Sequence, residues 1–387
     1  MVSSQTVSFI SFISKHGRSY KPGTPEYERR RSLFEVRAAE AELHNSKDKR
    51  RWTAGVNHLS DWTPEELAKL NGWKGDKRSA VRESGSGLAH AQQAVSLQQT
   101  DRAKPLPASV HWGDLNASKT VHSQGGCGSC WAVAAATIMQ AHSEIYSGSD
   151  WRTFAVQHMV DCVPNPNMCG GSGGCEGATV ELALDWALHN QVKTEQEMPY
   201  QAADFTCKKD SKFLSLHQSD SQAARAMEHN GMKGWQKLPE NKYEPLMRSV
   251  YEKGPVGVSV GASGWHSYAS GIYDNCAQDI VVNHAVTLIG YGVEQSTGDK
   301  FWTILNSWGQ DWGEGGQMRL LRSDDEEDYC GTDDDPAAGT GCRGGPEEVT
   351  VCGMCGILYD SALPKFAGSR KLAPQQSFLH MRGSVSK

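Results

Sequence analysis

The stretch from Gln124 to Val133, QGGCGSCWAV, constrains this chain more than any other part of its sequence. Its second cysteine, Cys130, lies three residues after Cys127 and directly precedes an apolar, alanine-rich run that predicts a buried helix. A thiol at a helix N-terminus faces unpaired backbone N–H groups and the positive end of the helix dipole, which stabilise the thiolate. Because the thiolate is the form that attacks a carbonyl carbon, Cys130 is a candidate nucleophile.

The pair Cys127 and Cys130 is also compatible with a structural role, as one half of a zinc site or as a redox pair. Two later segments favour catalysis, because His284 lies in an apolar, strand-like segment and Asn306 lies close to Trp308. A cysteine nucleophile needs an imidazole to share its proton, and the imidazole needs an amide oxygen that fixes its tautomer. A lone histidine in an apolar strand is more often a core residue, so the prediction depends on the three segments occurring together.

With Gln124 six residues before Cys130, these segments resemble a papain-like cysteine protease of the cathepsin L-like type, complete with its inhibitory prosegment. The resemblance extends from about residue 7 to about residue 365. It implies that Cys130 is the nucleophile and His284 the general base and acid. Asn306 would orient the imidazole through a hydrogen bond, which the ring of Trp308 would shield. The Gln124 side chain and the Cys130 backbone N–H would form an oxyanion hole. Loss of such a hole costs on the order of 10²–10³ in rate.

The same resemblance implies an α+β fold, in which a helical lobe faces an antiparallel, barrel-like β lobe and a small helical prosegment comes first. The residue patterns agree, since helical segments precede residue 225 and β-rich segments follow residue 232. Helices are expected after Cys130 and at 154–162 and 179–189, and strands at 255–260, 284–291, 301–306 and 317–321. The active cleft would lie between the two lobes.

Residues 1–74 are expected to form an inhibitory, chaperone-like prosegment. Helices are predicted at 7–16 and 26–45, and a capped helix start follows Trp62. Gly55 to Asp61 resembles the G-x-N-x-F-x-D motif of the family's prosegments, with Leu59 in place of the aromatic residue. In the family, the strand after this unit runs through the substrate cleft in the reverse direction.

Charge is divided unevenly along the chain. Residues 1–105 carry 18 Lys and Arg against 12 Asp and Glu, whereas the remainder carries 21 against 33. A basic front part can therefore dock on an acidic back part, and acid would weaken the attraction by protonating carboxylates. Two indifferent solvated surfaces are the alternative, and Asp61 and His58 are candidate pH sensors.

The remaining boundaries follow from composition and from the resemblance. Residues 75–105 are rich in Gly, Ser, Gln and charge and are expected to form a linker, with processing near Lys104 to Pro107. The peptidase domain is expected at 106–365, and a disordered tail at 366–387.

Eleven cysteines indicate an oxidising compartment. The resemblance implies the disulfides Cys127–Cys175, Cys162–Cys207 and Cys276–Cys355. Four further cysteines allow three pairings, of which we favour Cys330–Cys342 with Cys169–Cys352. A four-cysteine zinc site from Cys127, Cys130, Cys352 and Cys355 has acceptable spacing within each pair but leaves His284, Asn306 and Gln124 unexplained.

Cys130 lies 154 residues before His284, whereas about 130–150 is usual in the family, so the domain carries insertions. Residues 322–351 are one insertion, and residues 324–348 hold ten carboxylates against Arg343. This segment is either a solvated loop or a rim that attracts basic substrates.

Substrate contacts are implied by the resemblance alone. Asp360 would floor the pocket for the second residue before the scissile bond, where a carboxylate could also accept Arg or Lys. Its expected walls are Val180, Ser259, Val282 and Ala285, apolar on balance, so aliphatic or aromatic side chains should bind by burial. Gly177 and Ala178 are expected to contact the substrate backbone, although Ala178 stands where the family usually has glycine.

The sequence therefore predicts the zymogen of a cysteine endopeptidase, with a catalytically silent binding or inhibitory homologue as the alternative. An exopeptidase is not favoured, because the sequence shows no obvious histidine pair that would block the cleft. The expected partners are peptide or protein substrates, the chain's own prosegment and cystatin-like inhibitors, with no cofactor, metal, nucleic acid or membrane span, and the chain is expected to be a monomer. Lysosomal, vacuolar or secreted location is expected. Val7 to Ile13 is too short and too interrupted by serines for a signal peptide, whereas eleven cysteines indicate an oxidising compartment, so we expect that the true N-terminus precedes this sequence.

Overall fold

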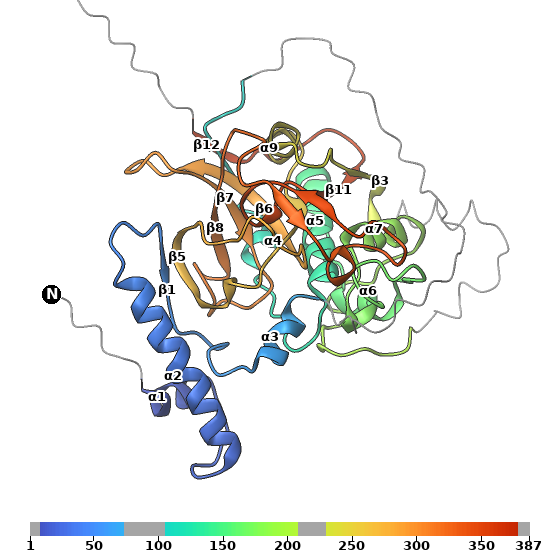
Figure 1. The fold of residues 1–387 in the computed structure, drawn as a ribbon. Coiled ribbons are helices and arrows are strands. Elements are labelled where there is room, and N and C mark those ends of the chain that lie inside the picture. The colour runs from blue at the N-terminus through green and yellow to red at the C-terminus, as the bar shows by residue number, and fades with distance from the viewer. Residues whose placement is uncertain (1–7, 73–104, 208–229, 378–387) are drawn as a thin grey trace, which may run out of the picture.

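The computed structural model describes residues 8–72, 105–207 and 230–377. The predicted linker lies outside these ranges except for Pro105, and of the predicted processing region, Lys104 to Pro107, Lys104 is also outside them. Figure 1 shows a long helix and its short neighbours at one side of a body in which strands and helices pack together. Among the described residues, no helix is both long enough and apolar enough to cross a membrane.

In its described part, residues 8–72, the prosegment contains three helices and one strand: α1 (Phe9–Lys15), α2 (Pro25–Asn45), β1 (Trp52–Ala54) and α3 (Pro64–Leu70). Their starts follow from local sequence. Thr24 and Thr63 cap α2 and α3 through their side chains, with proline next in each helix, and Glu66 completes a capping box with Thr63. Aromatic side chains that pack between α1 and α2 form a separate small core, made of Phe9, Phe12, Tyr27 and Phe34.

The helical lobe is organised around α5, which starts at Cys130 and lies at the centre of the molecule (Figure 1). Nearly all of α5 is buried, as its alanine-rich sequence predicts. The helices of the lobe are α4 (Asn116–Lys119), α5 (Cys130–Ser147), α6 (Val156–Cys162) and α7 (Val180–His189), with short 3-10 turns at Gly148–Asp150 and Gly174–Glu176. The three helices expected in this lobe are confirmed.

The β lobe is built on a ten-stranded sheet whose main path runs β1-β5-β8-β7-β6-β4-β11-β3. These strands are β3 (Met232–Lys237), β4 (Val256–Val260), β5 (Tyr268–Tyr273), β6 (His284–Val293), β7 (Lys300–Leu305), β8 (Gln317–Leu321) and β11 (Asp360–Phe366), accompanied by α9 (Tyr243–Glu252) and 3-10 turns at Trp265–Ser267 and Met354–Gly356. Neighbours are antiparallel except β5 and β8, which are parallel. The predicted α+β fold with two lobes is confirmed.

Strand β1 belongs to the prosegment but pairs with β5 of the peptidase domain. The edge of the sheet is therefore completed by the prosegment, in addition to any side-chain contacts. Backbone hydrogen bonds extend this junction, because Gly55 N donates to Ser267 O and Ile272 N donates to Arg51 O, both at 2.8 Å.

The prediction of a disordered tail from residue 366 is wrong for residues 366–377. Strand β12 (Gln375–Ser377) pairs with β2 (Ser109–His111), which in turn pairs with β6. Before β12, Arg370 donates to the carbonyl of Tyr251 at 2.7 Å. The tail signal failed because these backbone contacts need no apolar side chains; residues 378–387 lie outside the described part of the chain.

The three disulfides implied by the resemblance are present, as Cys127–Cys175, Cys162–Cys207 and Cys276–Cys355. The favoured pairing of the other four cysteines is wrong: the structure joins Cys169 to Cys342 and Cys330 to Cys352. Within the insertion, β9 (Gly331–Asp333) and β10 (Val349–Val351) form a hairpin, which brings the cysteines at its base together. The tip of the insertion, with a 3-10 turn at Pro336–Ala338, is then left to reach Cys169.

Candidate active site

Cys130 is the first residue of α5, and it is the only free cysteine of the eleven, all of which lie in the described ranges. The helix N-terminus is fixed by its neighbour, because Trp131 is fully buried and donates from Nε1 to the carbonyl of Gly174 at 3.1 Å. The cysteines of the alternative zinc site are otherwise engaged, since three of the four are in disulfides. In the described ranges, no cluster of His, Cys, Asp or Glu is arranged to hold a metal ion.

His284 begins β6 and Asn306 directly follows β7, so two adjacent strands bring these side chains together. His284 Nε2 lies 2.8 Å from Asn306 Oδ1, and the ring centroids of His284 and Trp308 are 5.1 Å apart. Asn306 Oδ1 can accept only from a protonated nitrogen, which assigns the proton to Nε2 and leaves Nδ1 available to a reacting group. All three side chains are buried.

Gln124 is held by a hydrogen-bond network that the sequence did not reveal. Its Oε1 accepts from Ser307 Oγ at 2.6 Å, and its backbone N donates to the carbonyl of Ser307 at 2.8 Å. Tyr200 donates from its hydroxyl to the carbonyl of Gln124 at 2.8 Å and lies 2.5 Å from Ser129 Oγ. Ser307 and Tyr200 thus fix the loop that carries Gln124 and Cys130; the only sequence signal for Ser307 was its place between Asn306 and Trp308.

The prosegment occupies this site. Gln124 Nε2 donates to the carbonyl of Leu70, the last residue of α3, at 3.1 Å. Gly72 lies against the thiol, because a Cβ added to Gly72 would be only 2.9 Å from Cys130 Sγ. Asn71 and Gly72 line the same cavity as Cys130 and His284. The side-chain amide that would stabilise an oxyanion is therefore bound to a carbonyl of the chain itself.

Burial under the prosegment keeps both reacting groups neutral. It raises the pKa of the Cys130 thiol to about 11, against smaller lowering effects of nearby backbone N–H groups. Burial also lowers the pKa of His284 to about 4, although the Asn306 side chain and the Leu70 backbone act in the opposite direction. Between these values the site holds a thiol and a neutral imidazole, which is not the charged pair that attacks a carbonyl.

Asp360 lies buried at the start of β11 and is already paired within the protein. Ser259 Oγ donates to its Oδ2 at 2.7 Å, and Lys237 Nζ lies 3.2 Å from its Oδ1. Burial would raise the pKa of Asp360, but the charge of Lys237 holds it below its usual range. Glu181 lies beside it, and burial together with the charge of Asp360 raises the pKa of Glu181, which makes Glu181 the protonated partner.

The other residues expected to contact substrate divide into two groups. Ala178, Ser259 and Ala285 line the cavity that contains Cys130, together with Thr179 and Asn283, which the sequence did not single out. Val180 and Val282 are buried and do not line this cavity, and Gly177 lies against the prosegment at Gly72.

Most carboxylates of the acidic insertion are exposed, but three of them contact other parts of the protein. Asp324 pairs with Lys300 and Arg322, and Glu326 pairs with Lys242. Asp333 is buried and accepts from the backbone N of Val282 at 3.0 Å. These three carboxylates hold the insertion on the β lobe, and the rim for basic substrates stays a prediction.

Comparisons with known proteins show which family this chain resembles. Residues 106–340 match the family described as papain family cysteine protease, and residues 9–67 match the cathepsin propeptide inhibitor domain. Procathepsin L of Rattus norvegicus is 30% identical over 329 residues, covering 82% of this chain and 87% of its own. A cathepsin L-like proteinase of Phaedon cochleariae is 29% identical over 330 residues, covering 84% and 90%.

Two solved structures of uncleaved forms are also similar. A recombinant stem bromelain precursor has a TM-score of 0.66 at 26% identity, covering 93% of this chain and 98% of its own. The proform of the ragweed pollen allergen Amb a 11, a cysteine protease, has a TM-score of 0.65 at 26% identity, covering 93% and 94%.

Proposed function

The chain belongs to the papain family of cysteine proteases and carries a cathepsin propeptide inhibitor domain, and from this premise we propose that it is a zymogen whose Cys130, His284 and Asn306 form the catalytic triad. It is a cysteine endopeptidase by its family. The prosegment, residues 8–72 of the described chain, acts as its intramolecular inhibitor.

In the active form, the Cys130 thiolate attacks the carbonyl carbon of the peptide bond. The negative charge on the former carbonyl oxygen is stabilised by Gln124 Nε2 and the Cys130 backbone N–H. His284 Nδ1, protonated by the thiol, then donates its proton to the leaving amine, while Asn306 keeps Nε2 oriented. Water, deprotonated by His284, hydrolyses the thioester and releases the acid product.

The observation that carries this proposal is the contact between Gln124 Nε2 and the Leu70 carbonyl. The same amide is needed for the oxyanion, so one hydrogen bond accounts both for the expected catalytic role of Gln124 and for inhibition. Gln124 Nε2 also donates to the carbonyl of Cys127 at 3.0 Å, so a prosegment that merely rested on the surface would leave only the N–H that now binds Leu70 free.

The pocket around Ser259 and Ala285 favours an apolar residue at the second position before the scissile bond. Asp360 would attract a basic side chain only if it were unpaired, but Lys237 already compensates its charge. Burial of an aliphatic side chain then remains as the source of affinity. The five disulfides further support a path through an oxidising compartment, as expected for a lysosomal, vacuolar or secreted enzyme.

Acid treatment of the purified chain at about pH 4–5 tests the proposal. Mass spectrometry should detect a fragment that begins near Leu106, and fluorogenic peptides with an apolar residue at the second position should be cleaved in a thiol-dependent manner. The Cys130→Ala chain should do neither. Removal of the prosegment without any cleavage of peptides would instead identify a catalytically silent homologue.

A further inference from the structure

The connection between β9 and β10, residues 334–348, crosses from the β lobe to the helical lobe, and we call it the strap. On the β lobe it is anchored at Val282, two residues before His284. Thr340 N donates to the carbonyl of Val282 at 3.0 Å, while Val282 N donates to Asp333 Oδ2 at 3.0 Å. Both backbone groups of Val282 are thus bound to the insertion.

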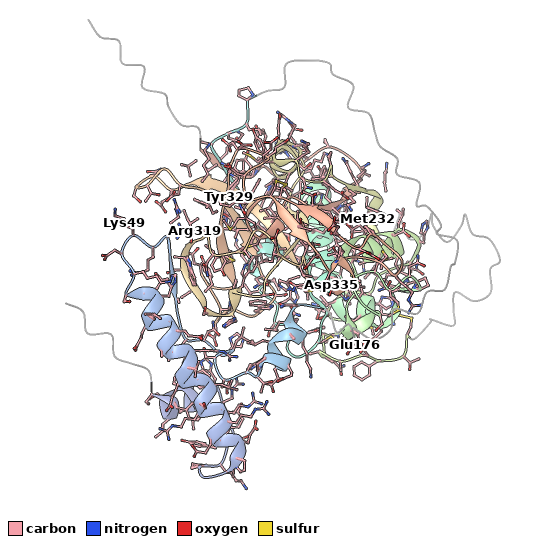
Figure 2. The ribbon with its side chains drawn as sticks, in the orientation of Figure 1. Lys49, Glu176, Met232, Arg319, Tyr329 and Asp335 are labelled. Atoms are coloured by element: carbon pink, nitrogen blue, oxygen red, sulfur yellow. A yellow bond between two sulfur atoms is a disulfide. The ribbon has the colours of Figure 1, made fainter. Side chains whose placement is uncertain are left out.

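On the helical lobe the strap is anchored to the loop between Cys162 and Cys175. Gly170 N donates to the carbonyl of Gly341 and Arg343 N donates to the carbonyl of Asn167, both at 2.9 Å. Next to these bonds, the disulfide Cys169–Cys342 joins the two lobes covalently. Figure 2 labels Asp335 at the start of the strap and Glu176 in the helical lobe.

The crossing lies at the substrate cleft. Gly339 and Thr340 of the strap, together with Gly170, line the cavity that contains Cys130, Ala178 and Ser259. Close packing leaves no gap at these points: a Cβ on Gly339 would be 2.1 Å from the carbonyl oxygen of Val282, and a Cβ on Gly170 would be 2.6 Å from that of Ala178. The strap is therefore an outer wall of the pocket proposed for the second substrate residue.

We propose that the strap ends the substrate groove beyond this pocket, so that the peptidase takes its selectivity from no more than two residues before the scissile bond, and earlier residues of the substrate leave the cleft towards solvent. The inference rests on the proposed function. An extended substrate needs a free strand edge at each residue that it pairs with. Here Gly170 packs against the carbonyl of Ala178, and both backbone groups of Val282 are bound to the insertion, so a third upstream residue finds no free strand edge to pair with.

Two variants test the inference. In the first, residues 334–348 are replaced by Asn-Gly, and Cys169→Ser removes the thiol that loses its partner. Asp333 and Val349 face each other in the hairpin, so a two-residue turn can join them and keep the hairpin and Cys330–Cys352. In the second, Cys169→Ser and Cys342→Ser leave the strap in place but free to open. Glu347→Gln with Glu348→Gln, two exposed carboxylates of the strap, is the matched control.

The measurement is kcat/KM of acid-processed enzyme on acetylated fluorogenic peptides with two, four or six residues before the cut and the same apolar second residue. Reductant is kept at the lowest level that maintains Cys130, and mass spectrometry under non-reducing conditions confirms Cys169–Cys342. For the natural chain and the control we expect the four- and six-residue peptides to be cleaved about as efficiently as the two-residue peptide, because their earlier residues gain no pairing in the cleft. In both strap variants the longer peptides should be cleaved at least tenfold more efficiently than the two-residue peptide.

The outcomes are separable. Longer peptides cleaved faster than the short one by the natural chain, with the disulfide intact, would overturn the inference and leave the proposed function standing. An unchanged length profile in both strap variants would overturn it as well. Failure of every form to cleave the two-residue peptide would overturn the proposed function itself, and the inference with it.

Discussion

The prosegment and the peptidase domain are stabilised by different means. The prosegment has a core of four aromatic side chains and a cluster of ion pairs in which Asp61 accepts two hydrogen bonds from Arg18 and one from Tyr20. The peptidase domain has all five disulfides and a core that contains Trp131, Trp265 and Trp312. Charges respond to pH, whereas disulfides and buried tryptophans do not.

Because of this difference, the prosegment can be released while the peptidase domain stays folded. The junction between them is strand pairing of β1 with β5, a few polar contacts and the occupied active site. Of the ion pairs in the described structure, those between prosegment and peptidase domain involve only Arg51 and His16, so the overall charge asymmetry of the sequence is used sparingly. Acid should therefore act mainly within the prosegment.

The largest expected effect comes from the residue that serves both parts. Gln124→Ala should lower kcat of the processed enzyme by 10²–10³, because the oxyanion loses a donor. The same substitution removes the bond to Leu70 and should weaken prosegment binding by only about 1 kcal/mol. The kcat on peptides after acid processing measures the first effect, and the rate of prosegment release before processing measures the second, with the exposed Gln201→Ala as control. Equal losses of free energy in catalysis and in prosegment binding would contradict the assigned role.

Asp61→Ala should release the prosegment without unfolding the peptidase domain. It leaves the Arg18 guanidinium without its buried carboxylate, and breaking such a pair costs about 3–5 kcal/mol. Proteolysis of the prosegment at neutral pH in a Cys130→Ala chain should accelerate at least 100-fold, while thermal unfolding of the remaining domain is unchanged. Glu65→Ala, which removes an exposed carboxylate of α3, should change neither.

His58 should contribute to release by acid. Burial lowers its pKa to about 4, with the neighbouring His16 and Arg18 acting in the same direction and Asp311 and Asp61 against it. Because the pKa of His58 is lower in the docked protein than in the free imidazole, His58 is neutral and compatible with docking above about pH 6.5. Between pH 6.5 and 4 the free energy of docking is lost progressively, by up to about 3 kcal/mol.

His58→Asn should accordingly flatten the pH dependence of prosegment release over that interval. Release rates of the Cys130→Ala chain, measured by added protease from pH 4 to pH 7.5, provide the test. His189→Asn, in an exposed position of α7, is the control. A profile for His58→Asn as steep as that of the natural chain would assign the pH response to carboxylates alone.

Arg51→Ala should have the smallest effect. Arg51 lies 3.0 Å from Asp274 and 3.3 Å from Asp299, but it is 46% exposed, and such surface pairs contribute about 0.2–1 kcal/mol. Release should accelerate two- to fivefold at low salt and not at 0.5 M salt. A much larger effect that disappears at 0.5 M salt would indicate that charge attraction holds the two parts together after all.

Much of the fold could be predicted because its signals are local. Helix starts at Thr24 and Thr63, the apolar run after Cys130 and the strands before Asn306 are visible in short stretches of sequence, and the structure places them there. The site residues can also be recognised in short stretches of sequence, because their chemistry requires particular side chains next to small or aromatic residues.

The rest depends on contacts between distant segments. The partner of Cys169 was assigned wrongly because it depends on where the strap folds back, which no local pattern specifies. Tyr200 and Ser307 support Gln124 through hydrogen bonds of common residue types. Strand β12 pairs through its backbone, and β1 completes a sheet of the other part of the chain, so neither follows from its own residues.

We propose that the prosegment inhibits the enzyme by burying the Cys130 thiol in a site where both the thiol and the His284 imidazole are neutral. The most direct test is the rate of Cys130 alkylation by iodoacetamide from pH 5 to pH 9, in the intact zymogen and after acid processing. Because the thiol pKa is raised to about 11, the zymogen should be nearly unreactive below pH 8, whereas the processed enzyme should react at least 10³-fold faster at pH 6. Equal rates in the two forms would contradict the account.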